Sequence, residues 1–219
     1  MIALEWFIDF SKTRILNKNV LEKEVLAKKD VLLESYYVAS EIEGEVFVKI
    51  KQLRTPMKTY VDVHVLPNTI LIRLVKVLEE IDHEKTKEIV YLGELKTPGK
   101  IPHHHHEHGY LGRTIVIEWF DEMLKKLSVS VVERNSYFEK ARRNLERIIK
   151  AQEHAKELSS EILVAIEGES ENAFGTSITR IVGIYTESSG NSYVCFIEEH
   201  ARENMVTHYF FKMGKVSIK

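Results

Sequence analysis

The amino-acid sequence predicts an α+β fold with a mixed or antiparallel sheet, at least three helices and a C-terminal antiparallel β-meander. Residues 45–54 and 59–66 alternate apolar and polar side chains, as strands with two different faces do. Residues 136–159 instead repeat apolar side chains every three or four positions, which is typical of a helix. After residue 176, short β-prone runs are separated by turn residues, and this spacing indicates a meander.

The first half of the chain is expected to begin with helical or mixed structure over residues 1–41. The strands at 45–54 and 59–66 then form a hairpin across the turn signal Thr55-Pro56-Met57. Residues 70–81 are predicted to be a helix, because Leu71, Leu74, Val75 and Leu78 form an apolar stripe at helical spacing. A strand is expected over residues 88–95.

The second half is expected to open with a strand from residue 113 to 119 that runs into a helix ending near residue 127. Ser136 and Glu139 have the spacing of a capping box, so the long helix is predicted to begin there and to end near residue 159. This helix has a narrow apolar stripe and a heavily charged opposite face. Such a helix either covers a sheet or pairs with a second copy of itself, which would make the protein a homodimer.

The chain has 219 residues, enough for one principal domain that buries a core without disulfides or a structural metal. The alternative is a body of residues 1–167 and a meander of residues 176–219. In that case the acidic, Gly-containing segment 168–175 is a connecting loop. No internal repeat is evident.

Composition argues against some classes of protein and excludes others. The net charge of −2 argues against a dedicated nucleic-acid binder, which usually carries a basic excess, but it does not exclude a nucleic-acid partner that binds a local basic patch. Cys195 is the single cysteine, so disulfides within the chain and Cys-rich zinc sites are excluded. It lies in an apolar run and is expected to be a small buried hydrophobe. The sequence shows no signal peptide or membrane span, so we expect a cytoplasmic protein without a membrane partner.

The strongest chemical feature is the run His103-His104-His105-His106-Glu107-His108. Imidazole is a common ligand of divalent transition metals such as zinc. In extended backbone, His104, His106 and His108 point to one side, while His103 and His105 point to the other. The first three are therefore the candidate metal ligands, with His103 and His105 as further candidates. Glu107 is a candidate either to act as a base or to orient a metal-binding histidine through a hydrogen bond.

The competing interpretation is a solvated loop that binds metal only adventitiously. A metal-dependent enzyme normally takes ligands from separate elements, and the sequence offers His64, His83, Glu118 and His208 as distant candidates without selecting among them. Metal content measured on untagged protein purified without a nickel column separates the two interpretations.

Asp62 with the sequence Glu94-Leu95-Lys96 resembles the signature of restriction-like nucleases. In that family two acids hold a divalent metal and the lysine assists the attacking water, which would make Glu94 and Lys96 catalytic candidates. Unlike the family pattern, a whole predicted helix separates Asp62 from Glu94. We therefore favour the alternative that these are ordinary charges at strand ends.

Two classes of function remain at this stage. The one we favour is a non-enzymatic binding, regulatory or accessory protein with a protein partner or a second copy of itself. The alternative is a metal-dependent hydrolase or nuclease-like enzyme that uses the cluster at residues 103–108. An enzyme would place these histidines in a concave pocket beside an acid from another element, whereas a binding protein would leave them on an open loop.

Overall fold

The computed structural model describes residues 3–97, 99 and 112–219. Within these residues the order of elements in the N-terminal part is β1 (Leu4–Trp6), the 3₁₀ turn η1 (Phe10–Lys12), α1 (Lys18–Ala27), α2 (Lys29–Ile42), β2 (Glu45–Leu53), β3 (Thr59–Leu66), β4 (Thr69–Ile81) and β5 (Glu84–Leu95). The C-terminal part consists of β6 (Ile115–Trp119), α3 (Asp121–Lys126), α4 (Val131–Arg143), α5 (Leu145–Glu157), β7 (Glu161–Ala173), β8 (Thr176–Thr186), β9 (Ser192–Arg202) and β10 (Met205–Ile218).

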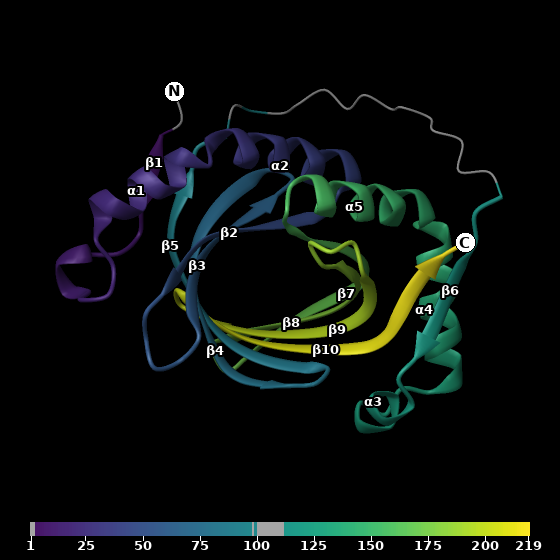
Figure 1. The fold of residues 1–219 in the computed structure, drawn as a ribbon. Coiled ribbons are helices and arrows are strands. Elements are labelled where there is room, and N and C mark those ends of the chain that lie inside the picture. The colour runs from purple at the N-terminus through teal and green to yellow at the C-terminus, as the bar shows by residue number, and fades with distance from the viewer. Residues whose placement is uncertain (1–2, 98, 100–111) are drawn as a thin grey trace.

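Eight of these strands close into an antiparallel barrel. They follow one another in the order β5-β4-β3-β2-β7-β8-β9-β10, and β10 pairs with β5 to complete the circle. Figure 1 looks into this barrel, with α2 and α5 side by side over the strands β2 and β7. The predicted α+β class with an antiparallel sheet is confirmed, and β7 to β10 are each paired with the next strand along the chain.

The two halves of the chain have the same architecture, which the sequence did not reveal. Each half begins with a short strand, continues through helical segments and ends in four barrel strands. The short strand pairs with the last strand of its own half, and in both halves a tryptophan lies opposite a glycine: Trp6 with Gly93, and Trp119 with Gly214. A Cβ atom on Gly93 would lie 2.6 Å from the carbonyl oxygen of Glu5, so this close approach requires glycine.

The register of the barrel repeats this equivalence. In the β2–β7 pairing, Val46 lies opposite Ile162, and the pairs on either side are related by exchanging the two halves. The β5–β10 pairing has the same symmetry about its central pair, Lys87 opposite His208. The backbone amide of Lys212 donates to the carbonyl of His83, and the amide of Tyr91 donates to the carbonyl of Asn204, which is the same contact in the other half. The fold is therefore a duplicated unit with an approximate twofold axis through the barrel.

The apolar side chains on the outside of the barrel form two main clusters under the helices. One cluster joins α1, α2 and part of α5 to β2–β5, and the other joins β6 and α3–α5 to β8–β10. Buried members of the first include Val25, Leu32, Val46, Val63 and Ile72; buried members of the second include Leu124, Ile148, Val182, Val194 and Met213. Because the helices bury the outward face, the other face of each strand points into the barrel.

The prediction of a helix over residues 70–81 is wrong, because this segment is strand β4. Its outward side chains, such as Ile72, pack under the helices, and its inward side chains, such as Val75, are buried as well. With apolar residues on both faces, the alternation that marks a half-exposed strand disappears and a helical spacing arises by coincidence.

The predicted helix over residues 136–159 starts too late and is two helices. Helix α4 begins at Val131, where the hydroxyl of Ser130 accepts from the amide of Glu133 at 3.1 Å and the Glu133 carboxylate accepts from the amide of Ser130 at 2.7 Å. This is the actual capping box. The helix is interrupted at Asn144, and α5 follows it. Helix α5 buries Ile148, Ile149, Ala151 and Ala155 against the sheet. Helix α5 thus covers a sheet, which is one of the two roles expected for this segment.

The expected connecting loop at residues 168–175 is a hairpin. Strand β7 extends to Ala173 and pairs with β8 up to Ala173 opposite Thr176. Phe174 and Gly175 form the turn, and both have positive φ angles, 50° and 75°, as tight hairpin turns require. Gly214 lies inside β10 next to a register shift. No helix in the described part of the chain is long and apolar enough to cross a membrane.

Candidate functional site in the barrel lumen

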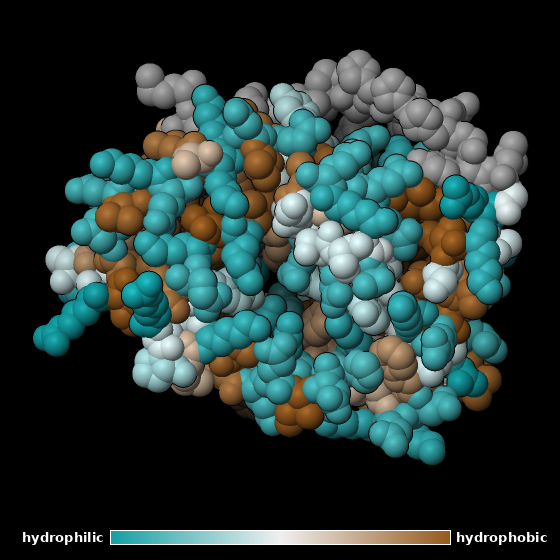
Figure 2. All heavy atoms as spheres, viewed as in Figure 1, coloured by the Kyte–Doolittle hydropathy of each residue, from teal (hydrophilic) through white to brown (hydrophobic). Residues whose placement is uncertain are grey.

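The inside of the barrel is lined by ionisable side chains rather than by a continuous apolar core. They surround a cavity of about 50 Å³ that opens to solvent. Its charged lining residues are the cations Arg73, Lys85, Lys87 and Lys212 and the carboxylates Glu45, Asp62, Glu161, Glu187 and Glu199. Figure 2 shows hydrophilic side chains around the middle of the face that Figure 1 views. The lumen is therefore a polar site inside an apolar shell.

Asp62 and Arg73 form a buried ion pair on the lumen wall. They are direct neighbours on β3 and β4, and the Arg73 guanidinium donates to both carboxylate oxygens at 2.8 and 2.7 Å. The guanidinium also lies over the ring of Phe47, 5.1 Å from its centroid. Both charged residues are about 5% exposed, so each depends on the other for compensation of its charge.

Glu45 and Glu161 occupy equivalent positions at the start of β2 and β7. The Glu161 carboxylate accepts a hydrogen bond from the Tyr185 hydroxyl, whereas Glu45 approaches the Nε2 atom of His64 at 3.4 Å. Burial alone would raise the pKa of Glu45, but His64 and Arg73 outweigh it and the pKa is lowered. Burial and the charge of Glu161 raise the pKa of Tyr185 well above its usual value, so this phenol stays protonated.

A row of three ionisable side chains crosses the opposite wall. Lys87, His208 and Glu199 are direct cross-strand neighbours on β5, β10 and β9. The Nε2 atom of His208 lies 3.7 Å from the Glu199 carboxylate. Cβ atoms of such neighbours are about 5 Å apart, so the three side chains share one part of the lumen.

The environment shifts the pKa of each member of this row. Burial, reinforced by the charges of Arg73 and Lys85 and opposed by Glu161, lowers the pKa of Lys87 to about 8. Burial and the nearby positive charges of Lys87 and Arg73 lower the pKa of His208 well below its usual value. Burial raises the pKa of Glu199, and the negative charge of Glu45 adds to this increase. Near neutral pH the row thus holds a neutral imidazole and an amine that titrates unusually low.

Several buried polar atoms of the lumen have no hydrogen-bond partner among the described residues. These are both ring nitrogens of His64 and the Nδ1 atom of His208. Two further atoms of this kind belong to Glu24 and Ser35, away from the lumen lining. The ring of His64 stacks on Phe47 with centroids 4.7 Å apart, so packing holds it in place, while the Glu45 carboxylate lies 3.4 Å from Nε2 without a well-aligned hydrogen bond. Buried polar atoms are normally hydrogen-bonded, and exceptions are frequent where a ligand completes the set.

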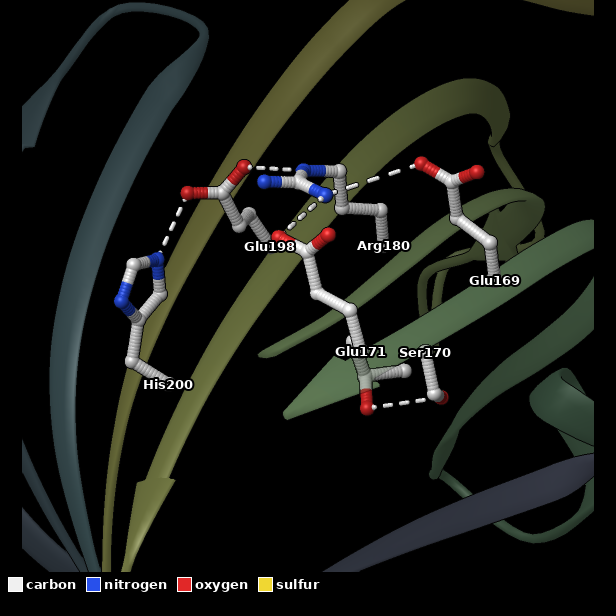
Figure 3. Close-up of polar contacts among 7 residues, drawn as sticks. Glu169, Ser170, Glu171, Arg180, Glu198 and His200 are labelled. Atoms are coloured by element: carbon white, nitrogen blue, oxygen red, sulfur yellow. Dashed lines mark hydrogen bonds and ion pairs between the residues drawn. The ribbon is translucent and has the colours of Figure 1, made fainter. Parts of the chain in front are cut away.

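One polar cluster on the outside of the barrel is different in kind. Arg180 contacts the carboxylates of Glu198, Glu171 and Glu169 at 2.9, 3.2 and 3.6 Å, and His200 contacts Glu198 at 2.6 Å, as Figure 3 shows. These side chains lie on the face of β7, β8 and β9 opposite to the lumen. The guanidinium has several partners and the side chains are partly or largely exposed to solvent. Ion pairs of this kind contribute little to the free energy of folding.

Each residue of the nuclease resemblance contacts a different partner in the structure. The Asp62 carboxylate is bound by Arg73, Glu94 accepts from the hydroxyl of Thr69 at 3.1 Å, and Lys96 pairs with Glu5 at 2.7 Å. Cys195 is buried beside Leu163, Ile197 and Phe210, as expected for a small hydrophobe, and burial raises the pKa of its thiol.

The histidine cluster His103–His108 with Glu107 lies outside the described residues, so its metal hypothesis stays a prediction. Among residues 3–97, 99 and 112–219 no group of three or more His, Cys, Asp or Glu side chains is arranged to hold a metal ion. Of the distant candidates, His64 and His208 lie in the lumen, whereas His83 stacks on Phe120 outside it.

No protein-family model, curated protein or solved structure matches the chain. The site is therefore interpreted from its own residues. Sequence analysis missed Lys87, Glu199 and Arg73. A signal was present for part of the site, because Asp62 and His64 interrupt the valines of β3 at every second position.

Proposed function

We propose that the protein is a binding protein whose barrel lumen takes up one small polar molecule. The observation that carries the proposal is that the ring nitrogens of His64 and the Nδ1 atom of His208 are buried without a hydrogen bond from the described residues, with only the Glu45 carboxylate, at 3.4 Å, near the Nε2 atom of His64. Leaving such a group unpaired costs about 1–3 kcal/mol, so a ligand that pairs with it recovers this free energy.

The charge distribution supports a polar ligand with both acceptor and donor groups. The Asp62–Arg73, Lys85–Glu80 and Lys212–Glu187 pairs neutralise one another at 2.7, 3.3 and 2.7 Å. Lys87 and the carboxylates of Glu45, Glu161 and Glu199 remain to interact with a guest. Ile89, Leu163, Ile197 and Phe210 add apolar surface to the same lining, so the molecule carries an apolar part beside its polar groups.

The proposal is tested with two matched variants. His64→Phe keeps the stacking on Phe47 and removes both nitrogens from the lumen. His83→Phe makes the same change at a histidine that stacks on Phe120 outside the lumen, with ring centroids 4.2 Å apart. Wild type and both variants are screened by thermal unfolding against amino acids, short carboxylates, amines, sugars and small aldehydes.

We expect at least one compound to stabilise wild type and His83→Phe but not His64→Phe. A ligand present at 100 times its dissociation constant adds about 2.7 kcal/mol to the free energy of unfolding. Equal stabilisation of both variants, or no stabilisation of wild type by any compound in the panel together with no co-purified molecule in native mass spectrometry, would refute the proposal.

A further inference from the structure

Of the four cations that line the cavity, Arg73, Lys85, Lys87 and Lys212, Lys87 is the one without a carboxylate partner among the described residues. Arg73 is bound by Asp62, Lys85 by Glu80 and Lys212 by Glu187. Within the described residues no carboxylate lies within ion-pair distance of the Lys87 amine. A half-buried lysine without such a partner exposes its nitrogen to whatever enters the lumen.

The neighbours of Lys87 supply groups that exchange protons. His208 is its direct neighbour on β10, and Glu199 follows His208 on β9. The imidazole is held neutral by burial and by the surrounding positive charges, and burial favours the protonated form of Glu199. The row thus places a proton acceptor and a proton donor beside one amine.

We propose that Lys87 reacts with a carbonyl group of the lumen ligand and holds it as a Schiff base. The ligand class is a small aldehyde or ketone with a polar substituent. This inference rests on the proposed function, because it assumes that the lumen is the binding site. A half-buried amine beside other cations is the arrangement that favours such covalent attachment.

The reaction balances with the groups present. The lone pair of the neutral Lys87 amine attacks the carbonyl carbon, and the carbonyl oxygen takes a proton from Glu199. The nitrogen of the resulting carbinolamine releases its surplus proton to His208. His208 then returns this proton to the carbinolamine hydroxyl, the C–O bond breaks as water leaves, and the nitrogen lone pair forms the C=N bond of a protonated Schiff base. No oxidant or reductant takes part.

The test is reductive trapping of wild type at pH 7 with propanal and sodium cyanoborohydride, followed by peptide mass mapping. Cyanoborohydride reduces the imine and leaves a propyl group on the lysine that formed it. At pH 7 about one in ten Lys87 side chains is a free amine, against about one in three thousand for an ordinary lysine. We expect Lys87 to be propylated on the order of 100-fold faster than Lys85 and Lys212, which line the same lumen.

A His208→Phe variant keeps an aromatic ring beside Lys87 and removes the proton acceptor. We expect its labelling at Lys87 to slow at least tenfold while labelling at Lys212 is unchanged. If Lys87 reacts no faster than Lys85 and Lys212, the Schiff-base inference is overturned. Stabilisation by other compounds that is lost in His64→Phe would then still support lumen binding, so the two failures are distinguishable.

Discussion

Replacing Lys87 with methionine should make the protein more stable at neutral pH. The pKa of Lys87 is about 8 in the folded protein and about 10.4 in an unfolded chain. Each pKa unit corresponds to about 1.4 kcal/mol, so keeping this lysine charged in the fold costs up to about 3 kcal/mol. Because solvent reaches the lumen, we expect Lys87→Met to add about 1–3 kcal/mol to the free energy of unfolding at pH 7.

The pH dependence fixes the sign of this effect. Between about pH 8 and 10.4 the unfolded chain binds more protons at this position than the folded protein does. The stability of wild type relative to Lys87→Met therefore rises with pH through this window. The advantage of the variant is complete below pH 8 and vanishes above about pH 10.4.

The assay is urea unfolding followed by circular dichroism at several pH values between 7 and 10.5. Lys76→Met is the control, because Lys76 lies opposite Glu88 in the β4–β5 register, on the outward face of the two strands. A Lys87→Met variant that is no more stable than wild type at pH 7, or whose advantage does not depend on pH, would refute the reasoning about burial of this amine.

Three further predictions concern the fold. Asp62→Leu should lower the free energy of unfolding by about 3–5 kcal/mol, because it leaves the buried Arg73 charge unpaired. The double variant Asp62→Leu/Arg73→Met should recover most of this loss. Equal stability of the single and the double variant in urea unfolding would contradict this. Gly93→Ala should cost about 2–3 kcal/mol because its Cβ meets the Glu5 carbonyl, whereas Gly168→Ala, whose nearest neighbour is 3.8 Å away, should change stability by less than about 0.5 kcal/mol in the same assay. Residues 1–97 and 113–219, expressed together as separate chains, should form a 1:1 complex in light scattering; failure to associate would argue against two structurally equivalent halves.

The strands that alternate in sequence are the ones the sequence predicts correctly. Val46 and Val48 lie under the helices on β2, and Val61, Val63 and Val65 do so on β3. Alternation shows that the two faces of a strand differ, but it does not show which face meets solvent. Here the polar face points into a closed barrel, and closure depends on the β5–β10 and β2–β7 pairings between segments far apart in the chain.

The candidate site is beyond sequence analysis for the same reason. Lys87 and His208 become neighbours only because two strands from different halves pair in one register. A local pattern contains no information about that register. The duplication itself left a trace in the segments Leu4-Glu5-Trp6-Phe7 and Ile117-Glu118-Trp119-Phe120, which become meaningful once each tryptophan is seen beside its glycine.

The two seams between the halves are unequal, and this gives the barrel a preferred line of opening. The β5–β10 seam pairs seven residues of each strand, whereas the β2–β7 seam pairs three. The weaker seam is bridged from outside by Arg147 of α5, which donates to the carbonyls of Ile42 and Glu43 at the end of α2. Transient separation of β2 from β7 would admit a ligand to the lumen while β5 and β10 stay paired. The backbone amides of β2 and β7 at their pairing should therefore exchange with deuterium sooner than those of β5 and β10.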